Sequence, residues 1–228
     1  MIKFDIITIF PQIFDSYISE SILKRAQQKK LVEFTIHNLR DYTHDKHKTV
    51  DDRPYGGGPG MILMVEPIYN ALGALTSKNK KLKRRVIMLT PAGKTFNQKQ
   101  AKRLSKYDQL IFLCGRYEGF DARTEKLVDE KISIGDYVLS GGELPAMVVA
   151  EAVARNIPGV IGHKHALAEE TFSFDLEYIE YPQYTRPEVF TMAVKSKKKS
   201  FRAPKLLLSG NHAAIADWRK KMAKKRQK

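Results

Sequence analysis

The first two thirds of the chain alternate between short apolar runs and segments in which apolar residues recur every three or four positions. The short runs, rich in β-branched and aromatic residues, predict buried strands at residues 2–10, 32–39, 86–89, 110–114 and 132–134. Helices are predicted at residues 11–23, 67–75, 97–104, 121–128 and 143–155. Strands that alternate with helices in this way favour an α/β fold, in which helices cover both faces of a parallel sheet.

The polar, glycine-rich segment at residues 40–60 fits neither period and predicts a long loop. Structureless loops of this length are uncommon inside a compact α/β unit and are often functional. Basic and acidic side chains are mixed along the segment, so an ordinary solvated loop is the alternative.

The pattern ends at Pro158 and Gly159, and we place the first domain at residues 1–160. Residues 161–184 show no clear period and are expected to form a linker between domains. Residues 185–228 are predicted to form a small, basic, mainly helical domain, with a helix near residues 213–224.

The composition predicts a globular protein of a reducing compartment, most simply the cytoplasm. Hydrophobic residues make up 43% of the 228 residues, which is enough for a sizeable core. No apolar run reaches the ~18 residues of a membrane span, and Asp5 interrupts the apolar stretch that a signal peptide would need. The single cysteine, Cys114, excludes an internal disulfide.

Charge is distributed unevenly and favours a polyanionic partner. The chain holds 40 Lys and Arg against 25 Asp and Glu, a net charge of +15. Thirteen of the basic residues and one acid, Asp217, lie in residues 195–228. Such a basic tail, with Phe201 and Trp218 among its lysines, suits a nucleic acid with unpaired bases; a tail that only improves solubility is the alternative.

Three glycine-containing segments directly follow predicted strands, at residues 90–94, 115–119 and 135–142. The carboxyl ends of parallel strands meet at one edge of a sheet, where ligands bind in open α/β folds. Glycine lets the backbone approach a ligand closely. We therefore expect a backbone-lined pocket for a small cofactor, although glycines can also simply end a strand.

Several familiar kinds of site do not fit the sequence. Gly93-Lys94-Thr95 resembles the end of a phosphate-binding loop, but Met88 stands where that loop needs its first glycine. The glycines at residues 56–60 do not match a dinucleotide fingerprint, and the histidine, cysteine and serine motifs of zinc enzymes and hydrolases are absent. Cys114 follows an apolar strand and is expected to be buried rather than nucleophilic.

Five motifs closely resemble bacterial tRNA (guanine-N1)-methyltransferases. They are RPYGGGPGM at residues 53–61, LCGRYEG at 113–119, SIGDYVLSGGELP at 133–145, YTRPE at 184–188 and LLSGNH at 207–212. The resemblance runs over nearly the whole chain. It implies methylation of the guanosine at position 37 of tRNA, next to the anticodon.

The resemblance also implies a SPOUT-type α/β domain with a deep trefoil knot, and a homodimer whose active site is shared between the subunits. S-adenosylmethionine would be the methyl donor, held in the three glycine-containing loops. The positions that match the family's cofactor site are Leu89, Thr90, Pro91, Gly93, Gly115, Tyr117, Glu118, Ile134, Gly135, Asp136, Tyr137, Val138, Leu139, Gly141, Gly142 and Pro145. No metal ligand is expected, although the family suggests dependence on Mg²⁺.

Two catalytic positions follow from the same resemblance. Glu170 stands where the family usually has the aspartate that acts as the base, and Arg155 matches the arginine that stabilises charge on the guanine. Glu169 is the alternative to Glu170 as the base. Arg155, at the C-terminal end of a predicted helix, could instead interact favourably with the helix dipole. The C-terminal domain is expected to be shorter than in longer relatives. A tRNA-binding protein that keeps the fold without the chemistry is the rival interpretation.

Overall fold

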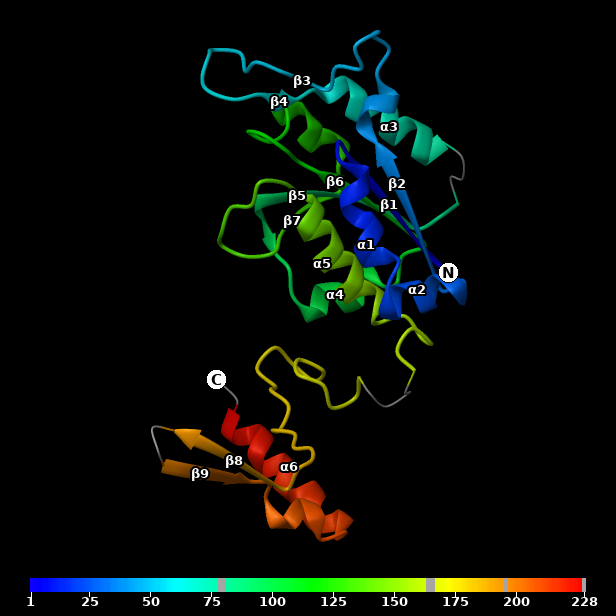
Figure 1. Ribbon diagram of the computed structural model, residues 1–228. Helices are drawn as coiled ribbons and strands as arrows, with labels where there is room; N and C mark the ends of the chain where they lie inside the picture. The colour runs from blue at the N-terminus through cyan, green and yellow to red at the C-terminus, as the bar shows by residue number, and fades with distance from the viewer. Residues whose placement is uncertain (78–80, 163–166, 195–196, 227–228) are drawn as a thin grey trace. The chain divides into compact units, whose positions relative to one another are not determined.

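The computed structural model describes residues 1–77, 81–162, 167–194 and 197–226. It divides into two compact units, Met1–Lys164 and His165–Lys228 (Figure 1). Residues 163–166 of the expected linker, and Lys195 at the start of the basic tail, lie outside the described residues. Among the described residues, no helix is long and apolar enough to cross a membrane.

The first unit is built on a five-stranded sheet in the order β2-β1-β6-β5-β7. The strands are β2 (Val32–Asn38), β1 (Ile2–Thr8), β6 (Gln109–Cys114), β5 (Arg84–Thr95) and β7 (Glu130–Ser133). Every neighbouring pair is parallel. The predicted parallel α/β sheet is therefore confirmed.

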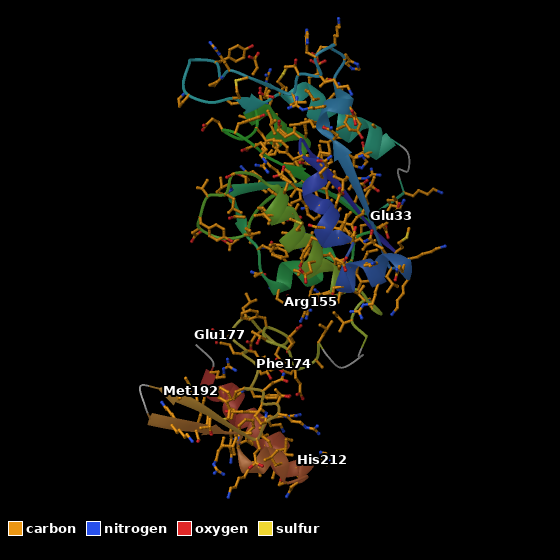
Figure 2. The ribbon with its side chains drawn as sticks, viewed as in Figure 1. Glu33, Arg155, Phe174, Glu177, Met192 and His212 are labelled. Atoms are coloured by element: carbon orange, nitrogen blue, oxygen red, sulfur yellow. The ribbon has the colours of Figure 1, made fainter. Side chains whose placement is uncertain are left out.

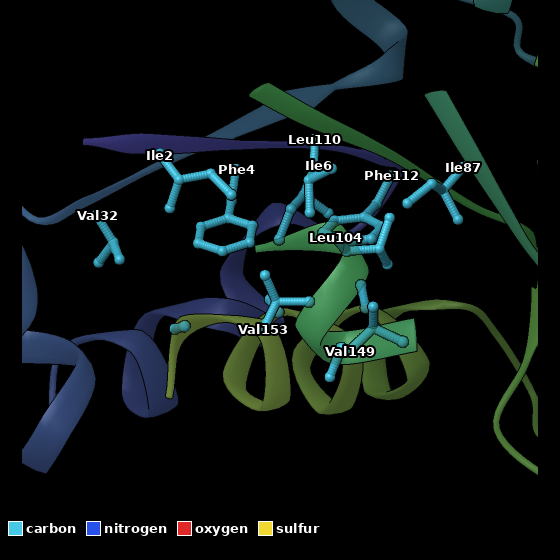
Figure 3. Packing of buried hydrophobic residues seen from close by; sticks show 14 of the residues in the cluster. Ile2, Phe4, Ile6, Val32, Ile87, Leu104, Leu110, Phe112, Val149 and Val153 are labelled. Carbon is cyan, nitrogen blue, oxygen red and sulfur yellow. The ribbon is translucent and has the colours of Figure 1, made fainter. Parts of the chain in front are cut away.

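One face of the sheet packs against α2 (Ser21–Gln28), α4 (Gln98–Leu104) and α5 (Glu143–Ala154). Alternate strand residues such as Phe4 and Phe112 point to these helices and are fully buried (Figure 3). Their rings stack at 6.3 Å between centroids. Burying one large apolar side chain is worth about 1.5–3 kcal/mol, so this layer supplies much of the stability.

The intervening strand residues form a second core on the opposite face. Ile7, Ile111 and Leu113 pack there with α3 (Val65–Ser77) and the 3₁₀ turn η2 (Leu39–Tyr42). The two cores place helices on both faces of the sheet, as the alternation of strand and helix predicts.

The prediction of one continuous helix at residues 11–23 is wrong. It is divided into the 3₁₀ turn η1 (Pro11–Phe14), α1 (Asp15–Ile18) and α2. Ser21 has a left-handed backbone with φ of 48°, which a continuous helix cannot contain. The helical spacing is preserved because each short piece still turns its apolar side toward the sheet.

The segment at residues 40–60 is not a wholly structureless loop. It begins within η2 and contains β3 (Asp51–Asp52), which pairs antiparallel with β4 (Ile62–Leu63). Val50 is fully buried in the second core. One apolar side chain and a short strand pair therefore fix a segment that polarity alone predicts to be irregular.

β5 continues through the glycine-containing segment at residues 90–94, beyond the strand predicted at residues 86–89. Leu89 and Lys94 both pair with Ile132, so the residues between them bulge out of the sheet. A Cβ atom on Gly93 would lie 2.5 Å from the backbone of Ile132, which explains the glycine. The helix predicted at residues 121–128 is a 3₁₀ helix, η3 (Ala122–Leu127).

The second unit contains a β-hairpin that the prediction of a mainly helical domain missed. β8 (Val189–Val194) pairs antiparallel with β9 (Lys197–Arg202), followed by the 3₁₀ turn η4 (Lys205–Leu208) and α6 (His212–Arg226). The helix predicted near residues 213–224 matches α6. The lysines of β9 give the sequence the appearance of a charged tail, although β8 is apolar enough for a strand.

Residues 167–184 contain no helix or strand, yet they pack within the second unit. The Tyr184 ring lies 6.3 Å from the Trp218 ring on α6. The Arg219 guanidinium lies 4.8 Å from the Tyr181 ring centre. These contacts attach the chain that carries Glu170 to the helix of the same unit.

Candidate functional site

A cavity of about 400 Å³ opens at the carboxyl ends of β6 and β7 and at the bulge of β5. This is within the range of about 300–1,000 Å³ that small-molecule sites occupy. Residues from all three glycine-containing loops line it. The predicted cofactor positions that do so are Leu89, Thr90, Pro91, Gly115, Tyr117, Glu118, Ile134, Gly135, Tyr137, Val138, Leu139, Gly141, Gly142 and Pro145.

Two predicted cofactor positions, Gly93 and Asp136, are not among the residues that line the cavity. Gly93 is packed against Ile132 behind the bulge of β5. The structure adds further lining residues that the sequence reasoning did not single out, among them Arg116, Phe120 and Ser140. Arg116 and Phe120 lie in or beside the LCGRYEG motif, so the motif itself was the available signal.

Two of the glycines lie so close to neighbouring residues that a side chain at either position would clash with them. A Cβ atom on Gly142 would lie 2.7 Å from the Cα of Cys114, and one on Gly115 would lie 2.8 Å from the Phe120 ring. The Gly142 amide also donates to the carbonyl of Gly115, at 2.9 Å. The two loops therefore meet backbone to backbone, and together they form one wall of the cavity.

We expect Gly115→Val to weaken binding of S-adenosylmethionine by at least about tenfold, because the new side chain pushes the Phe120 ring into the cavity. Calorimetric titration of the donor into the purified variant measures this. Gly162→Val is the matched control, since nothing lies within 4 Å of a Cβ atom at that position. Equal affinity in both variants would show that the donor does not bind in this cavity.

A buried ion pair joins the loops beneath the cavity. The Arg116 guanidinium lies 2.9 Å from the carboxylate of Glu143, whose side chain is only 2% exposed. The Thr8 hydroxyl donates to the same carboxylate at 2.7 Å. Arg116 also lies over the Phe10 ring, 4.7 Å from its centre. These contacts tie the end of β1, the loop after β6 and the first turn of α5 together.

The thiol of Cys114 lies next to this ion pair and is buried. Burial raises its pKa well above the usual value, and the nearby Glu143 carboxylate acts in the same direction. The residue is therefore a neutral thiol at physiological pH, and it packs in the first core. This agrees with the expectation of a buried, unreactive cysteine.

Glu143→Ala should lower the free energy of unfolding by about 3 kcal/mol, because it leaves the Arg116 guanidinium without its buried counter-charge. Urea unfolding monitored by circular dichroism measures the change. Arg123→Gln breaks the exposed pair with Asp121 and should leave the unfolding midpoint unchanged. Similar midpoints for the two variants would contradict a stabilising role for the buried pair.

Arg155 lies at the carboxyl end of α5, where its amide donates to the carbonyl of Glu151 (Figure 2). Pro145, near the other end of the helix, lines the cavity. Ten residues of α-helix span about 15 Å, whereas an extended arginine side chain reaches about 7 Å. Arg155 therefore does not reach the part of the cavity that α5 forms.

Glu170 lies in a segment of the second unit that hydrogen bonds hold in shape. Its carbonyl accepts from the amide of Ser173, and the Phe172 amide donates to the carbonyl of Tyr178. Glu170 is partly buried, whereas Glu169 is exposed and accepts from the Tyr181 hydroxyl at 3.3 Å. The two candidate bases thus have different surroundings, which the sequence could not show.

A comparison with models of protein families finds one that matches residues 2–228, described as tRNA (guanine-1)-methyltransferase TrmD. The chain belongs to this family. Within it, the sequence is 50% identical to a protein of Dictyoglomus turgidum named tRNA (guanine-N(1)-)-methyltransferase, over 99% of this chain and 86% of that protein. A protein of the same name from Bacillus pumilus is 47% identical, over 98% of this chain and 88% of that protein.

Family membership extends over both units, since the matched residues include the loops around the cavity, Arg155 and Glu170. Among the described residues, no group of three or more His, Cys, Asp and Glu side chains is placed to hold a metal ion.

Proposed function

We propose that this protein transfers a methyl group from S-adenosylmethionine to N1 of the guanosine at position 37 of tRNA. The observation that carries the proposal is the family match over residues 2–228 in a chain whose three glycine-containing loops meet around one cavity. The names of its relatives, tRNA (guanine-N(1)-)-methyltransferase, give the reaction and the substrate.

The cavity fits S-adenosylmethionine in size and in chemistry. Its glycine positions offer bare backbone amides and carbonyls for the polar groups of the donor, and Leu89, Ile134 and Leu139 offer apolar surface. When bound, the donor supplies an electrophilic methyl group on a positively charged sulfur. Glu118 is among the residues that line the cavity, and an acidic residue there suits a cationic ligand.

N1 of neutral guanine carries a proton and is a poor nucleophile, so a base must remove that proton. In this proposal the Glu170 carboxylate accepts it. The donor, held by residues of the three glycine-containing loops, would supply its methyl group to N1 and would leave as a neutral thioether that keeps the electron pair of the carbon–sulfur bond. Negative charge that develops at O6 of the guanine is stabilised by the Arg155 guanidinium in a desolvated site.

The proposal includes a homodimer with shared active sites. Five large apolar side chains are exposed on η1, α1, α5 and the residue before η1, namely Phe10, Ile13, Tyr17, Leu144 and Val148. The Tyr17 hydroxyl donates to Glu151, so α1 and α5 are joined at this surface. A second copy would cover these side chains, and its Arg155 could approach the cavity that the first copy's Arg155 does not reach.

The remaining family features also belong to the proposal. A trefoil knot is proposed from membership of the family. A location in the cytoplasm follows from the substrate. If the reaction depends on Mg²⁺, the ion would be held chiefly by substrate groups, because the described residues offer no preformed cluster.

The direct test is incubation with labelled S-adenosylmethionine and unmethylated tRNA. The proposal requires label in tRNA that has guanosine at position 37, and none when adenosine replaces it. Tight tRNA binding without any incorporation would favour the rival interpretation, a tRNA-binding protein without catalytic activity.

A further inference from the structure

The loop at residues 134–142 forms part of the wall of the cavity proposed for S-adenosylmethionine, yet it contains neither helix nor strand. It connects the end of β7 with the start of α5, and Val138 within it is 83% exposed. The packing of such an exposed segment is too slight to keep it in one shape. A contact that holds this loop from outside therefore also sets the shape of the cavity.

Arg116 lies across this loop. Its backbone forms an antiparallel bridge with Gly141, and a Cβ atom on Gly141 would lie only 2.3 Å from the Arg116 Nε. Its Nη1 donates to the carbonyl of Ser140 at 3.4 Å, and its Nε is buried without a hydrogen-bond partner among the described residues. The guanidinium is thus packed against the loop backbone, to which it makes one long hydrogen bond.

Two residues from other parts of the chain hold the Arg116 guanidinium in this place. The buried Glu143 carboxylate lies 2.9 Å from Nη2 and also accepts from the Thr8 hydroxyl. The Phe10 ring lies 4.7 Å from the guanidinium carbon. Burying the Nε–H group without a partner is unfavourable, and these two contacts offset that cost.

We propose that Arg116 is a positioning residue for the methyl donor: clamped by Glu143 and Phe10, it holds residues 140–142 in the shape that binds S-adenosylmethionine. It acts through the loop, because Glu143 and Gly141 already occupy Nη2 and the side of Nε. Phe10 is not among the residues that line the cavity, yet its ring supports donor binding through Arg116. The inference rests on the proposed function, since the donor is the one named there.

Arg116→Lys is the first test. It keeps a positive charge beside Glu143 but loses the planar guanidinium that lies against the loop. A smaller population of the binding-competent loop raises the apparent dissociation constant by the same factor, and we expect a rise of about 5- to 50-fold by calorimetric titration of S-adenosylmethionine. The KM for the donor should rise likewise, with kcat unchanged at saturating donor. Arg103→Lys, the same change in the ion pair with Glu130, is the control and should bind the donor as the native protein does.

A second ligand separates support of the loop from direct contact with the donor. 5′-Methylthioadenosine has the nucleoside and the sulfur of the donor but neither its carboxylate nor its ammonium group. Because Arg116 acts through the loop, Arg116→Lys should weaken both ligands by similar factors. Weaker binding of S-adenosylmethionine alone would show that Arg116 contacts the donor carboxylate, and would overturn the proposal.

Phe10→Leu tests the aromatic ring at an exposed position, so it also serves if Arg116→Lys does not fold. It should weaken donor binding about 2- to 5-fold, as expected for an exposed cation–π contact, and Phe10→Tyr should restore the native affinity. Ile13→Val changes the same exposed apolar surface without removing a ring, and sedimentation checks that each variant associates as the native protein does.

Native donor affinity in Arg116→Lys would overturn the proposal, and native affinity in Phe10→Leu would remove Phe10 from the clamp. If the native protein binds neither ligand, this inference and the proposed function both fail. If both ligands bind and the variants weaken them as expected, but no tRNA is methylated, the proposed function fails alone.

Discussion

Glu170→Gln should lower the rate of methyl transfer about 10²- to 10⁴-fold, the usual contribution of a general base. The glutamine side chain has the same shape as glutamate but cannot accept the N1 proton. Affinities for tRNA and for S-adenosylmethionine should be preserved. Single-turnover measurement with saturating donor and tRNA isolates this step from product release.

The matched control is Glu169→Gln, which makes the same change one residue earlier. Glu169 is exposed and bound to the Tyr181 hydroxyl, so its variant should keep a rate close to native. Glu170→Asp should remain active because it restores the residue usual in the family. A near-native rate in Glu170→Gln would exclude Glu170 as the base.

Mixed dimers should recover activity that neither parent variant has. Arg155→Ala removes the stabilising charge, and loss of such a group costs about 10²- to 10³-fold in rate. Gly115→Val blocks the donor cavity. A dimer of one Arg155→Ala subunit and one Gly115→Val subunit keeps one intact cavity, and the other subunit supplies the arginine to it.

Such dimers can be isolated by co-expression of the two variants with different affinity tags and sequential purification on both. We expect about half of the native activity, since one of two symmetric sites is complete. Dimers that carry both substitutions in one subunit and none in the other are the control. If the Arg155→Ala and Gly115→Val mixture is inactive while this control is active, Arg155 acts on its own subunit's site.

Strands and loops that depend on the local pattern of apolar residues and glycines could be predicted from the sequence. Apolar runs located the five strands of the sheet, and the glycines that follow three of them located the cavity. Gly93 does not line the cavity. Glycine is required at this position because the backbone packs closely against Ile132. Glycine marks a close approach, but the sequence does not say whether the neighbour is a ligand or another strand.

Features that depend on distant partners could not be predicted in the same way. Arg116 and Glu143 are far apart in sequence, and nothing in either neighbourhood indicates that they form a buried pair. The length of α5 separates Arg155 from the cavity, which the family resemblance alone does not reveal. The hairpin was missed because the lysines of β9 obscure the pattern of a strand, and its pairing with β8 is a contact that the sequence does not show.

The central claim is that this chain methylates N1 of one guanosine in tRNA. Unmethylated tRNA can be treated with the protein and S-adenosylmethionine carrying a ¹³C-labelled methyl group, digested to nucleosides, and analysed by chromatography and mass spectrometry. We expect label in 1-methylguanosine, and a parallel ribonuclease digestion to oligonucleotides should place that label in the fragment that contains position 37. Label in another methylated nucleoside, or 1-methylguanosine from another position, would contradict it.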